Sequence, residues 1–336
     1  MFTASNCKKN PVEPPPPPAN DTTSHAWTFT ISFLGDGNGS ALYDISIVND
    51  TLAYAAGAVY KEDSSGNWGI NPYNLVKYDG IQWNLKQVKV SFYGNTIVVP
   101  LQGVNAFSST QIWLAGSLPI YGSDSTWQMY DLRTTLNPNI DVSKTWGVNP
   151  QQMYFVGLSG SIVSCFNGNW QKITSGTTLN VQDIYGSNST ILAVASNPGE
   201  SLDKQILQIN GTTVSQLSIN PIQQPLSSVW FVPGHYYVVG QGIYEKTSLS
   251  DPVWQQDSID TVDFFSCIRG NAWNDFFVAG GYGQLLHFNG KSWQSYQNVL
   301  GMEKGAIARI AVKGNLMIAV GQLGSNAVAI VGRRQD

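Results

Sequence analysis

Charged residues are scarce in this chain. Asp, Glu, Lys and Arg make up 12 % of its 336 residues, about half of the usual ~25 %. The 18 Lys and Arg residues against 22 Asp and Glu give a net charge of −4, and no basic block occurs. A nucleic-acid partner, recognised through its phosphate backbone, is therefore not expected. A run of about 18 apolar residues is also lacking, which excludes a membrane-spanning helix.

Cysteine is equally sparse, with three residues that show no metal-ligand spacing. Cys165 and Cys267 fall at different strand positions of non-adjacent repeats, so we expect small buried side chains and no disulfide. Cys7 is followed by five consecutive prolines, Pro14 to Pro18, which form a semi-rigid polyproline II spacer. This arrangement resembles the start of a mature bacterial lipoprotein, in which Cys7 would be acylated. The alternative is an unstructured tail in which Cys7 is incidental.

A repeated unit of short apolar strands and turns dominates the rest of the chain. Phe264 to Gln294 shows it best, with the Asn289-Gly290 turn typical of a tight hairpin. Aligned first strands begin at Asp44, Gly103, Thr145, Asp183, Ser228, Cys267 and Arg309. Successive starts differ by 59, 42, 38, 45, 39 and 42 residues. A period near 40 with four short strands predicts the blades of a β-propeller.

The two ends of the repeat predict how the ring closes. The seventh unit stops just after Arg333-Arg334 and has no fourth strand, whereas His25 to Phe33 forms an unassigned apolar strand before the first unit. A closing N-terminal strand would remove an exposed sheet edge. We therefore predict an all-β, seven-bladed propeller of four-stranded blades over residues 25–336, with residues 1–24 as a lipoprotein-like N-terminus and proline-rich linker.

The turns and tryptophans of the repeat carry a family resemblance. An Asn-Gly or Asp-Gly turn is followed closely by Trp in Asp79–Trp83 and Asn289–Trp293. We expect such tryptophans to pack between blades. The pattern resembles secreted bacterial propellers of the Asp-box (BNR-like) kind and is similar to the photosystem II assembly-factor type, over roughly residues 26–334. The full Ser-x-Asp-x-Gly-x-x-Trp core is not met. The resemblance implies the architecture and carries over no catalytic residue.

Two variable columns on the innermost strands supply candidate ligand-binding residues. The alignment places Thr145 in the first column and Trp146 in the apolar column between the two, which period-2 alternation assigns to the core. The polar and aromatic candidates near the channel are Asp44, Asp183, Tyr185, Trp230, Arg269 and Arg309. The alternative is pairing between blades, for instance Arg309 with Asp44, because buried charges need partners.

Two enlarged loops are further candidates, since loops on a rigid scaffold often carry binding sites. They are Lys61 to Pro72 in the first unit and Ser196 to Lys204 in the fourth. Trp68, an aromatic residue in a polar loop, is the ligand-binding candidate there. Neutral variation of a surface loop is the alternative.

Catalytic interpretations find little support in the sequence. Asp44 and Asp183 could supply the two acids of a glycoside hydrolase, but their blades are nearly opposite across the channel. A sialidase-like propeller would need a cluster of arginines to bind a carboxylate, but the chain has five arginines and two of them lie at its end. The three histidines occupy scattered positions. Gly35 to Ser40 could be read as a calcium loop, but it lacks the final acidic residue. We expect no cofactor and no metal.

The sequence thus favours a non-catalytic, surface-exposed bacterial propeller lipoprotein that binds or assembles with a protein or a glycan. A carbohydrate-active enzyme of the glycoside hydrolase kind is the alternative. We expect a monomer outside the cytoplasm, anchored to the outer membrane or cell surface only through a lipid on Cys7, or else secreted. The identity of the protein or glycan partner stays open.

Overall fold

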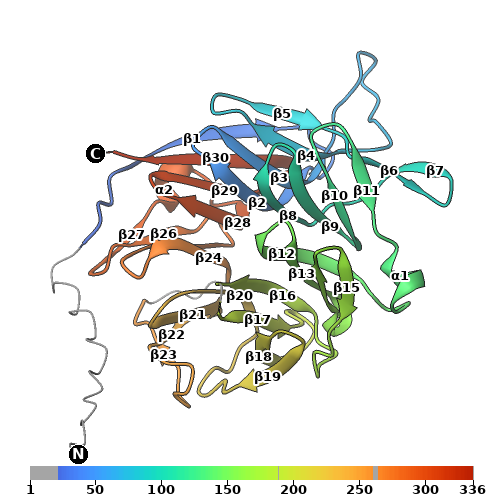
Figure 1. The fold of residues 1–336 in the computed structure, drawn as a ribbon. Helices are drawn as coiled ribbons and strands as arrows, with labels where there is room; N and C mark the ends of the chain where they lie inside the picture. The colour runs from blue at the N-terminus through green and yellow to red at the C-terminus, as the bar shows by residue number, and fades with distance from the viewer. Residues whose placement is uncertain (1–21, 188, 260–263, 336) are drawn as a thin grey trace, which may run out of the picture.

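The computed structural model describes residues 22–187, 189–259 and 264–335, which form a ring of antiparallel sheets (Figure 1). Within these residues, seven sheets have four strands each, and two further strands form a separate hairpin. Each four-stranded sheet is one blade, and its first-strand edge faces the centre of the ring. The all-β, seven-bladed fold predicted from the repeat is confirmed.

Blades 1 to 3 follow one another along the chain. Blade 1 contains β2 (Ala41–Asn49), β3 (Leu52–Val59), β4 (Tyr73–Tyr78) and β5 (Trp83–Lys86). The separate hairpin contains β6 (Lys89–Phe92) and β7 (Asn95–Val98). Blade 2 contains β8 (Gly103–Ser108), β9 (Gln111–Gly116), β10 (Leu118–Gly122) and β11 (Trp127–Met129). Blade 3 contains β12 (Val142–Asn149), β13 (Gln152–Gly157), β14 (Ile162–Phe166) and β15 (Asn169–Lys172).

Blades 4 to 7 complete the ring. Blade 4 contains β16 (Val181–Gly186), β17 (Ile191–Ser196), β18 (Lys204–Asn210) and β19 (Thr213–Leu217). Blade 5 contains β20 (Leu226–Val232), β21 (His235–Gly240), β22 (Gly242–Lys246) and β23 (Gln255–Gln256). Blade 6 contains β24 (Phe265–Ala272), β25 (Asp275–Gly280), β26 (Leu285–Phe288) and β27 (Trp293–Ser295). Blade 7 contains β28 (Gly305–Lys313), β29 (Leu316–Leu323), β30 (Asn326–Arg334) and β1 (Trp27–Leu34).

The core lies between the blades. The described residues form seven hydrophobic clusters, each shared by two adjacent blades. The second strand of a blade is sandwiched by both neighbours, so β25 is buried at every residue. Tryptophans of the fourth strands pack into these clusters, as expected, and Trp254 is 1 % exposed. Cys165 and Cys267 are buried free thiols in two different clusters, so the prediction that they are buried and do not pair is confirmed.

The N-terminal strand closes the ring as predicted. Strand β1 pairs antiparallel with β30 from Trp27 opposite Arg334 to Leu34 opposite Ala327. Figure 1 shows the first and last strands side by side in one sheet. Phe29 and Ile31 pack against the cluster between blades 6 and 7. The ends of the propeller are therefore joined by backbone hydrogen bonds and by apolar burial.

Register shifts in the first strands correct one detail of the sequence alignment. A bulge lies near the start of six first strands, and a second bulge near the end of β2, β8, β12 and β24. The second bulge adds one residue before the glycine that closes the second strand. Lys144 lies opposite Val156 as Asp44 lies opposite Ala56. In blade 3 the first variable column therefore contains Lys144, one residue before the predicted Thr145. Trp146 accordingly belongs to the second variable column.

The glycine that closes most second strands has a steric reason. At Gly157 a Cβ atom would lie 2.3 Å from the carbonyl oxygen of Asp141, and at Gly57 it would lie 2.3 Å from that of Ala41. Both carbonyls belong to the chain entering the first strand, just before the bulge. The backbone of the incoming chain thus passes where any side chain would stand.

The connections define two faces of the propeller. In a four-stranded meander, the connections from strand 2 to 3 and from strand 4 to the next blade lie at one end, here named the loop face. The 1-to-2 and 3-to-4 turns lie at the other end, the turn face. The helices α1 (Leu132–Thr135) and α2 (Gln297–Leu300) belong to the loop face. Within the described residues no helix is long and apolar enough to cross a membrane.

Candidate functional site

Five charged side chains converge at the centre of the ring, and we name them the central cluster: Asp44, Lys144, Asp183, Arg269 and Arg309. Each comes from the first strand of its blade, where the innermost backbone brings all blades together. They line a cavity of about 160 Å³. The structure therefore brings together the charged candidates predicted from the variable columns and adds Lys144, which the misaligned third unit had hidden.

Asp183 is the most densely bonded member of the central cluster. Arg269 contacts both of its carboxylate oxygens, with Nη2 at 2.9 Å from Oδ1 and Nη1 at 3.0 Å from Oδ2. The Ser228 hydroxyl donates to Oδ2 at 2.5 Å, and Nη2 of Arg309 lies 3.6 Å from Oδ1. Blades 4, 5, 6 and 7 are thus joined through one carboxylate.

Asp44 has a different partner from the one suggested by the sequence. Its Oδ2 lies 3.7 Å from Nζ of Lys144 and accepts the Val104 N–H at 3.1 Å. Lys144 also donates to the carbonyl oxygens of Tyr43 and Gln102, at 3.0 and 2.8 Å. The proposed Arg309–Asp44 ion pair is not formed, because Arg309 pairs with Asp183 and the lysine is closer to Asp44.

The charge distribution fixes protonation states in the central cluster. Burial by itself would raise the pKa of the Asp183 carboxyl, but the charges of Arg269 and Arg309 outweigh it and lower the pKa to about 2. Burial lowers the pKa of the Lys144 ammonium to about 8, against the opposing charge of Asp44. Asp183 is therefore ionised at any ordinary pH and has no proton to donate as the general acid of a glycoside hydrolase.

The aromatic candidates pack around these charges. Arg269 lies over the ring of Tyr185, with its guanidinium carbon 5.3 Å from the ring centroid. Trp230 is 1 % exposed and stacks on Tyr237 at a centroid distance of 5.7 Å. The guanidinium of Arg269 also donates to Asp183 and to the Ser228 hydroxyl, which is the pairing between blades named as the alternative. A role of these central residues in binding a ligand stays a prediction.

Trp68 does not line the central cavity. It is 37 % exposed in the connection between β3 and β4, where it bridges to Glu62. Its ring covers the preceding connection, so that a Cβ on Gly37 would lie 3.5 Å from it. Asp36 in that connection binds Nζ of Lys61 at 2.7 Å and the Glu62 N–H at 3.0 Å. The loop that could be read as a calcium site thus uses its carboxylate to hold the Trp68 loop.

Large apolar side chains are exposed unevenly on the two faces. Among connections outside the described strands, the turn face exposes two of them, Ile81 and Val253. The loop face exposes eight, namely Trp68, Ile70, Tyr93, Leu136, Leu158, Leu202, Tyr282 and Val299. Where exposed apolar side chains adjoin one another, they commonly mark an interaction surface.

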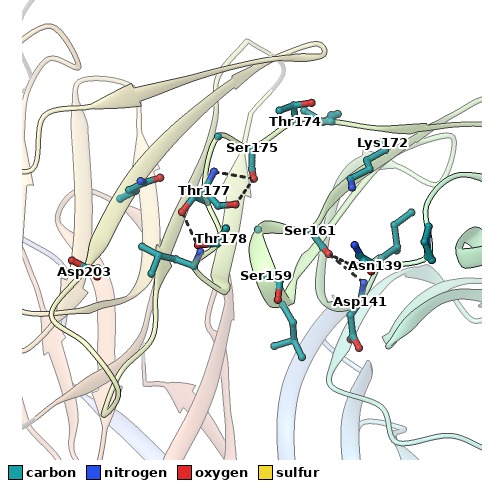
Figure 2. A pocket seen from close by; sticks show the side chains of 18 of the residues that line it. Asn139, Asp141, Ser159, Ser161, Lys172, Thr174, Ser175, Thr177, Thr178 and Asp203 are labelled. Carbon is teal, nitrogen blue, oxygen red and sulfur yellow. Dashed lines mark hydrogen bonds between the residues drawn. The ribbon is translucent and has the colours of Figure 1, made fainter.

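A groove of about 1180 Å³ crosses the loop face above blade 3, and we name it the blade 3 groove (Figure 2). Its lining comes from four connections, at residues 133–141, 158–161, 172–179 and 203–205. At Gly160, whose φ is +70°, a Cβ would lie 2.0 Å from the carbonyl oxygen of Thr177. Two of the connections therefore pack directly against each other and hold the groove open in one shape.

Polar groups of the blade 3 groove fall into two kinds. Some hold its walls together: Arg133 pairs with Asp141 at 3.0 Å, and the Ser161 hydroxyl accepts the Asp141 N–H. Others are free to meet a ligand. Lys172 and Asp203 are exposed, form no ion pair within the described residues, and lie on opposite sides of the groove in Figure 2.

The sequence did not predict the blade 3 groove, but it did predict one loop of its lining as a candidate binding site. Asp203 and Lys204 belong to the enlarged fourth-unit loop, which also carries the exposed Leu202. The remaining lining comes from the connection between blades 2 and 3, which contains α1, and from two connections of blade 3. Their sequences carry no unusual signal, because the hollow arises from how the connections are spaced around the ring.

The structure also shows that two of the scattered histidines meet. Nδ1 of His25 lies 2.8 Å from Nδ1 of His287. The other ring nitrogen of His287, Nε2, contacts Asp275. Two histidines that are scattered in the sequence are thus neighbours in the fold. Residues 262 positions apart come together because ring closure places the start of β1 beside blade 6.

Comparison with known proteins gives the fold. No protein-family model matches the sequence, and no curated protein matches it. Among solved structures, "YCF48 bound to D1 peptide" superposes with a TM-score of 0.67 at 15 % identity, covering 94 % of this chain and 98 % of that one. YCF48 from Cyanidioschyzon merolae gives 0.63 at 14 % identity, covering 92 % and 98 %. The WD40 propeller domain of Doa1 gives 0.65 at 12 % identity, covering 91 % and 96 %.

Proposed function

We propose that this chain is a non-catalytic binding module and that a protein partner docks on its loop face. The uneven exposure of large apolar side chains carries the proposal, with eight on the connections of the loop face against two on the turn face. Exposed apolar groups beside polar ones form the usual core and rim of a protein interface. The likeness in fold to a YCF48 structure solved with a peptide is consistent with this use of a propeller.

The blade 3 groove favours an extended polypeptide over a glycan as the group recognised. Its lining contains no aromatic ring, although aromatic rings are the large rigid contact surfaces that ligand pockets commonly present. It offers exposed hydroxyls at Thr174 and Thr178 and the two unpaired charges of Lys172 and Asp203. Such groups suit the amides and charged side chains of a peptide.

Site-specific photo-crosslinking in the source cells tests the choice of face. A benzophenone amino acid replaces Leu202 or Tyr282 on the loop face, and Ile81 or Val253 on the turn face serves as the matched exposed control. We expect one common protein adduct from the loop-face positions and none from the controls. Adducts of equal yield from both faces, or from Ile81 alone, contradict the proposal.

We further propose that the protein is a bacterial lipoprotein held outside the cytoplasm by an acyl group on Cys7. The support is the sequence, in which Cys7 precedes the proline run at Pro14 to Pro18. Both lie outside the described residues. A mass spectrum of the protein purified from its source tests this, with diacylglycerol on Cys7 expected. An unmodified cysteine in the mature protein contradicts the anchor and leaves the binding proposal untouched.

A further inference from the structure

The start of the closing strand is tied to blade 6 by a chain of titratable side chains. His25 Nδ1 lies 2.8 Å from Nδ1 of His287, and Nε2 of His287 lies 2.9 Å from Oδ1 of Asp275. Arg334, on the partner strand of β1, donates to the same oxygen of Asp275. We name these four linked side chains the closure latch. We propose that the closure latch makes closure of the ring by β1 dependent on pH.

The hydrogen-bond geometry limits the number of protons that the latch can hold. Because Asp275 is an acceptor, Nε2 of His287 carries its proton, and Nδ1 of a neutral His287 is left as an acceptor. His25 then donates from Nδ1, and its Nε2, at 3.1 Å from the Ser292 hydroxyl, accepts. One added proton fits on Nε2 of His25, because the hydroxyl can accept instead. A second would place two N–H groups head to head across 2.8 Å.

The surroundings of the pair do not relieve this conflict. His287 is 0 % exposed and lies between Phe277 and Trp27, at centroid distances of 4.6 and 5.9 Å. Rotating its ring would break the bond to Asp275. The buried imidazole is therefore fixed in the orientation that permits only one proton between the two rings.

The other charged groups around the latch do not change state near neutrality. Asp275 from β25 has a lowered pKa because hydrogen bonds from His287 and Asn271 and the charge of Arg334 outweigh its burial. Burial raises the pKa of Tyr296, beside α2, to about 12, and its hydroxyl donates to the His25 carbonyl at 2.6 Å. Lys291, in the turn before Ser292, is exposed and forms no ion pair with any described residue. The proposal therefore concerns the protons shared by the two imidazoles.

The sign of the effect follows from proton counts. An open strand leaves both imidazoles to titrate near their ordinary value of about 6.5. In the closed ring, burial lowers the pKa of His25, and the charge of His287 lowers it further. Closure is therefore at full strength above about pH 6.5 and weakens as pH falls, by up to tenfold in the closed-to-open ratio per pH unit for each proton excluded.

Amide hydrogen exchange at pH 7.5 and pH 5.5 tests the latch in the full chain, with each rate divided by its intrinsic value. We expect the protection of β1 (Trp27–Leu34) to fall about three- to tenfold more than that of β13, far away in blade 3. In His25→Asn, whose amide can still donate near the Nδ1 position but cannot titrate, the excess fall disappears. His235→Asn removes the third histidine, in blade 5, and should still show the excess fall in protection of β1.

Two results overturn the proposal. One is protection of β1 and β13 that falls in parallel in the wild-type protein, and the other is an excess fall that persists in His25→Asn. If His25→Asn folds poorly, nitrogen-15 spectra of the wild-type imidazoles decide. Two rings that both become fully protonated near pH 6.5 while β1 stays protected exclude the latch.

Discussion

The central cluster and the blade 3 groove both gather charged side chains but bond them in opposite ways. In the central cluster, Asp183 is bound by Arg269, Arg309 and a hydroxyl, and Asp44 by Lys144 and backbone N–H groups. In the groove, Lys172 and Asp203 have no ion pair within the described residues. Buried charges must be compensated inside the protein, whereas exposed ones can await a partner. The first region holds the blades together, and the second is open for recognition.

Removing a carboxylate from the central cluster tests that view with the largest expected effect. Asp183→Ala leaves the buried guanidinium of Arg309 and the half-buried one of Arg269 without their anion, and we expect the free energy of unfolding to fall by about 3–5 kcal/mol. Urea denaturation measures the change. Asp203→Ala in the groove is the matched control and stays within about 0.5 kcal/mol of wild type. Similar losses for both variants would erase the distinction between the two regions.

Titrating the central lysine gives a smaller effect with a definite sign. The pKa of Lys144 is lowered to about 8 in the folded protein, against about 10.4 in an unfolded chain. Between these values the unfolded state binds more protons, so raising the pH stabilises the fold by up to about 1.4 kcal/mol per pH unit. Urea denaturation of wild type and Lys144→Met at pH 8.0 and 9.5 isolates this gain, which only the wild type shows. Equal gains in both proteins would place Lys144 in a solvated site.

Reversing the groove charges sharpens the comparison from the other side. Lys172→Glu and Asp203→Lys each leave the free energy of unfolding within about 0.5 kcal/mol, because both side chains are exposed and neither forms an ion pair within the described residues. Peptides selected by display against the wild-type protein should lose about two- to fivefold in affinity for the variant that repels them, the size of an exposed ion pair. Peptides selected against each variant should carry the opposite charge at that position. Unchanged peptide preferences argue against the groove as the docking site.

Trp68 is expected to have only a small effect on stability. Trp68→Ala removes a 37 % exposed ring from a surface connection, so the free energy of unfolding changes by no more than about 1 kcal/mol. If the loop of blade 1 contacts the partner, the crosslinking yield at Leu202 falls in this variant while the melting temperature stays close to that of the wild type. Ile70→Ala, in the same connection and 96 % exposed, is the matched control for loss of apolar area.

The sequence was sufficient for the architecture because its signal is repeated seven times. Apolar second strands and closing glycines recur at nearly constant spacing, and the unpaired strand before the first unit had only one place to go. The same repetition was insufficient for the register of blade 3. A bulge of one residue moved Lys144 into the place given to Thr145, and a bulge leaves no mark in composition.

The candidate sites were less predictable because they depend on distances across the ring. Side chains from the first strands meet at the axis whatever their type, so Asp183 and Arg269 could be grouped from their columns alone. Their pairing could not be chosen in advance over Arg309 with Asp44. His25 and His287 became neighbours only through closure, and the blade 3 groove is a space between four connections rather than a pattern in any one of them.

Closure by β1 also determines the face of the propeller at which the chain enters it. Strand β1 is the fourth strand of blade 7 and runs toward the loop face, so Trp27 stands at the turn face beside Arg334. A tether, fusion partner or immobilising tag attached ahead of Trp27 therefore enters the propeller from the side opposite the exposed apolar residues. A surface holding the chain by that end would lie behind the propeller, and the loop face would look outward.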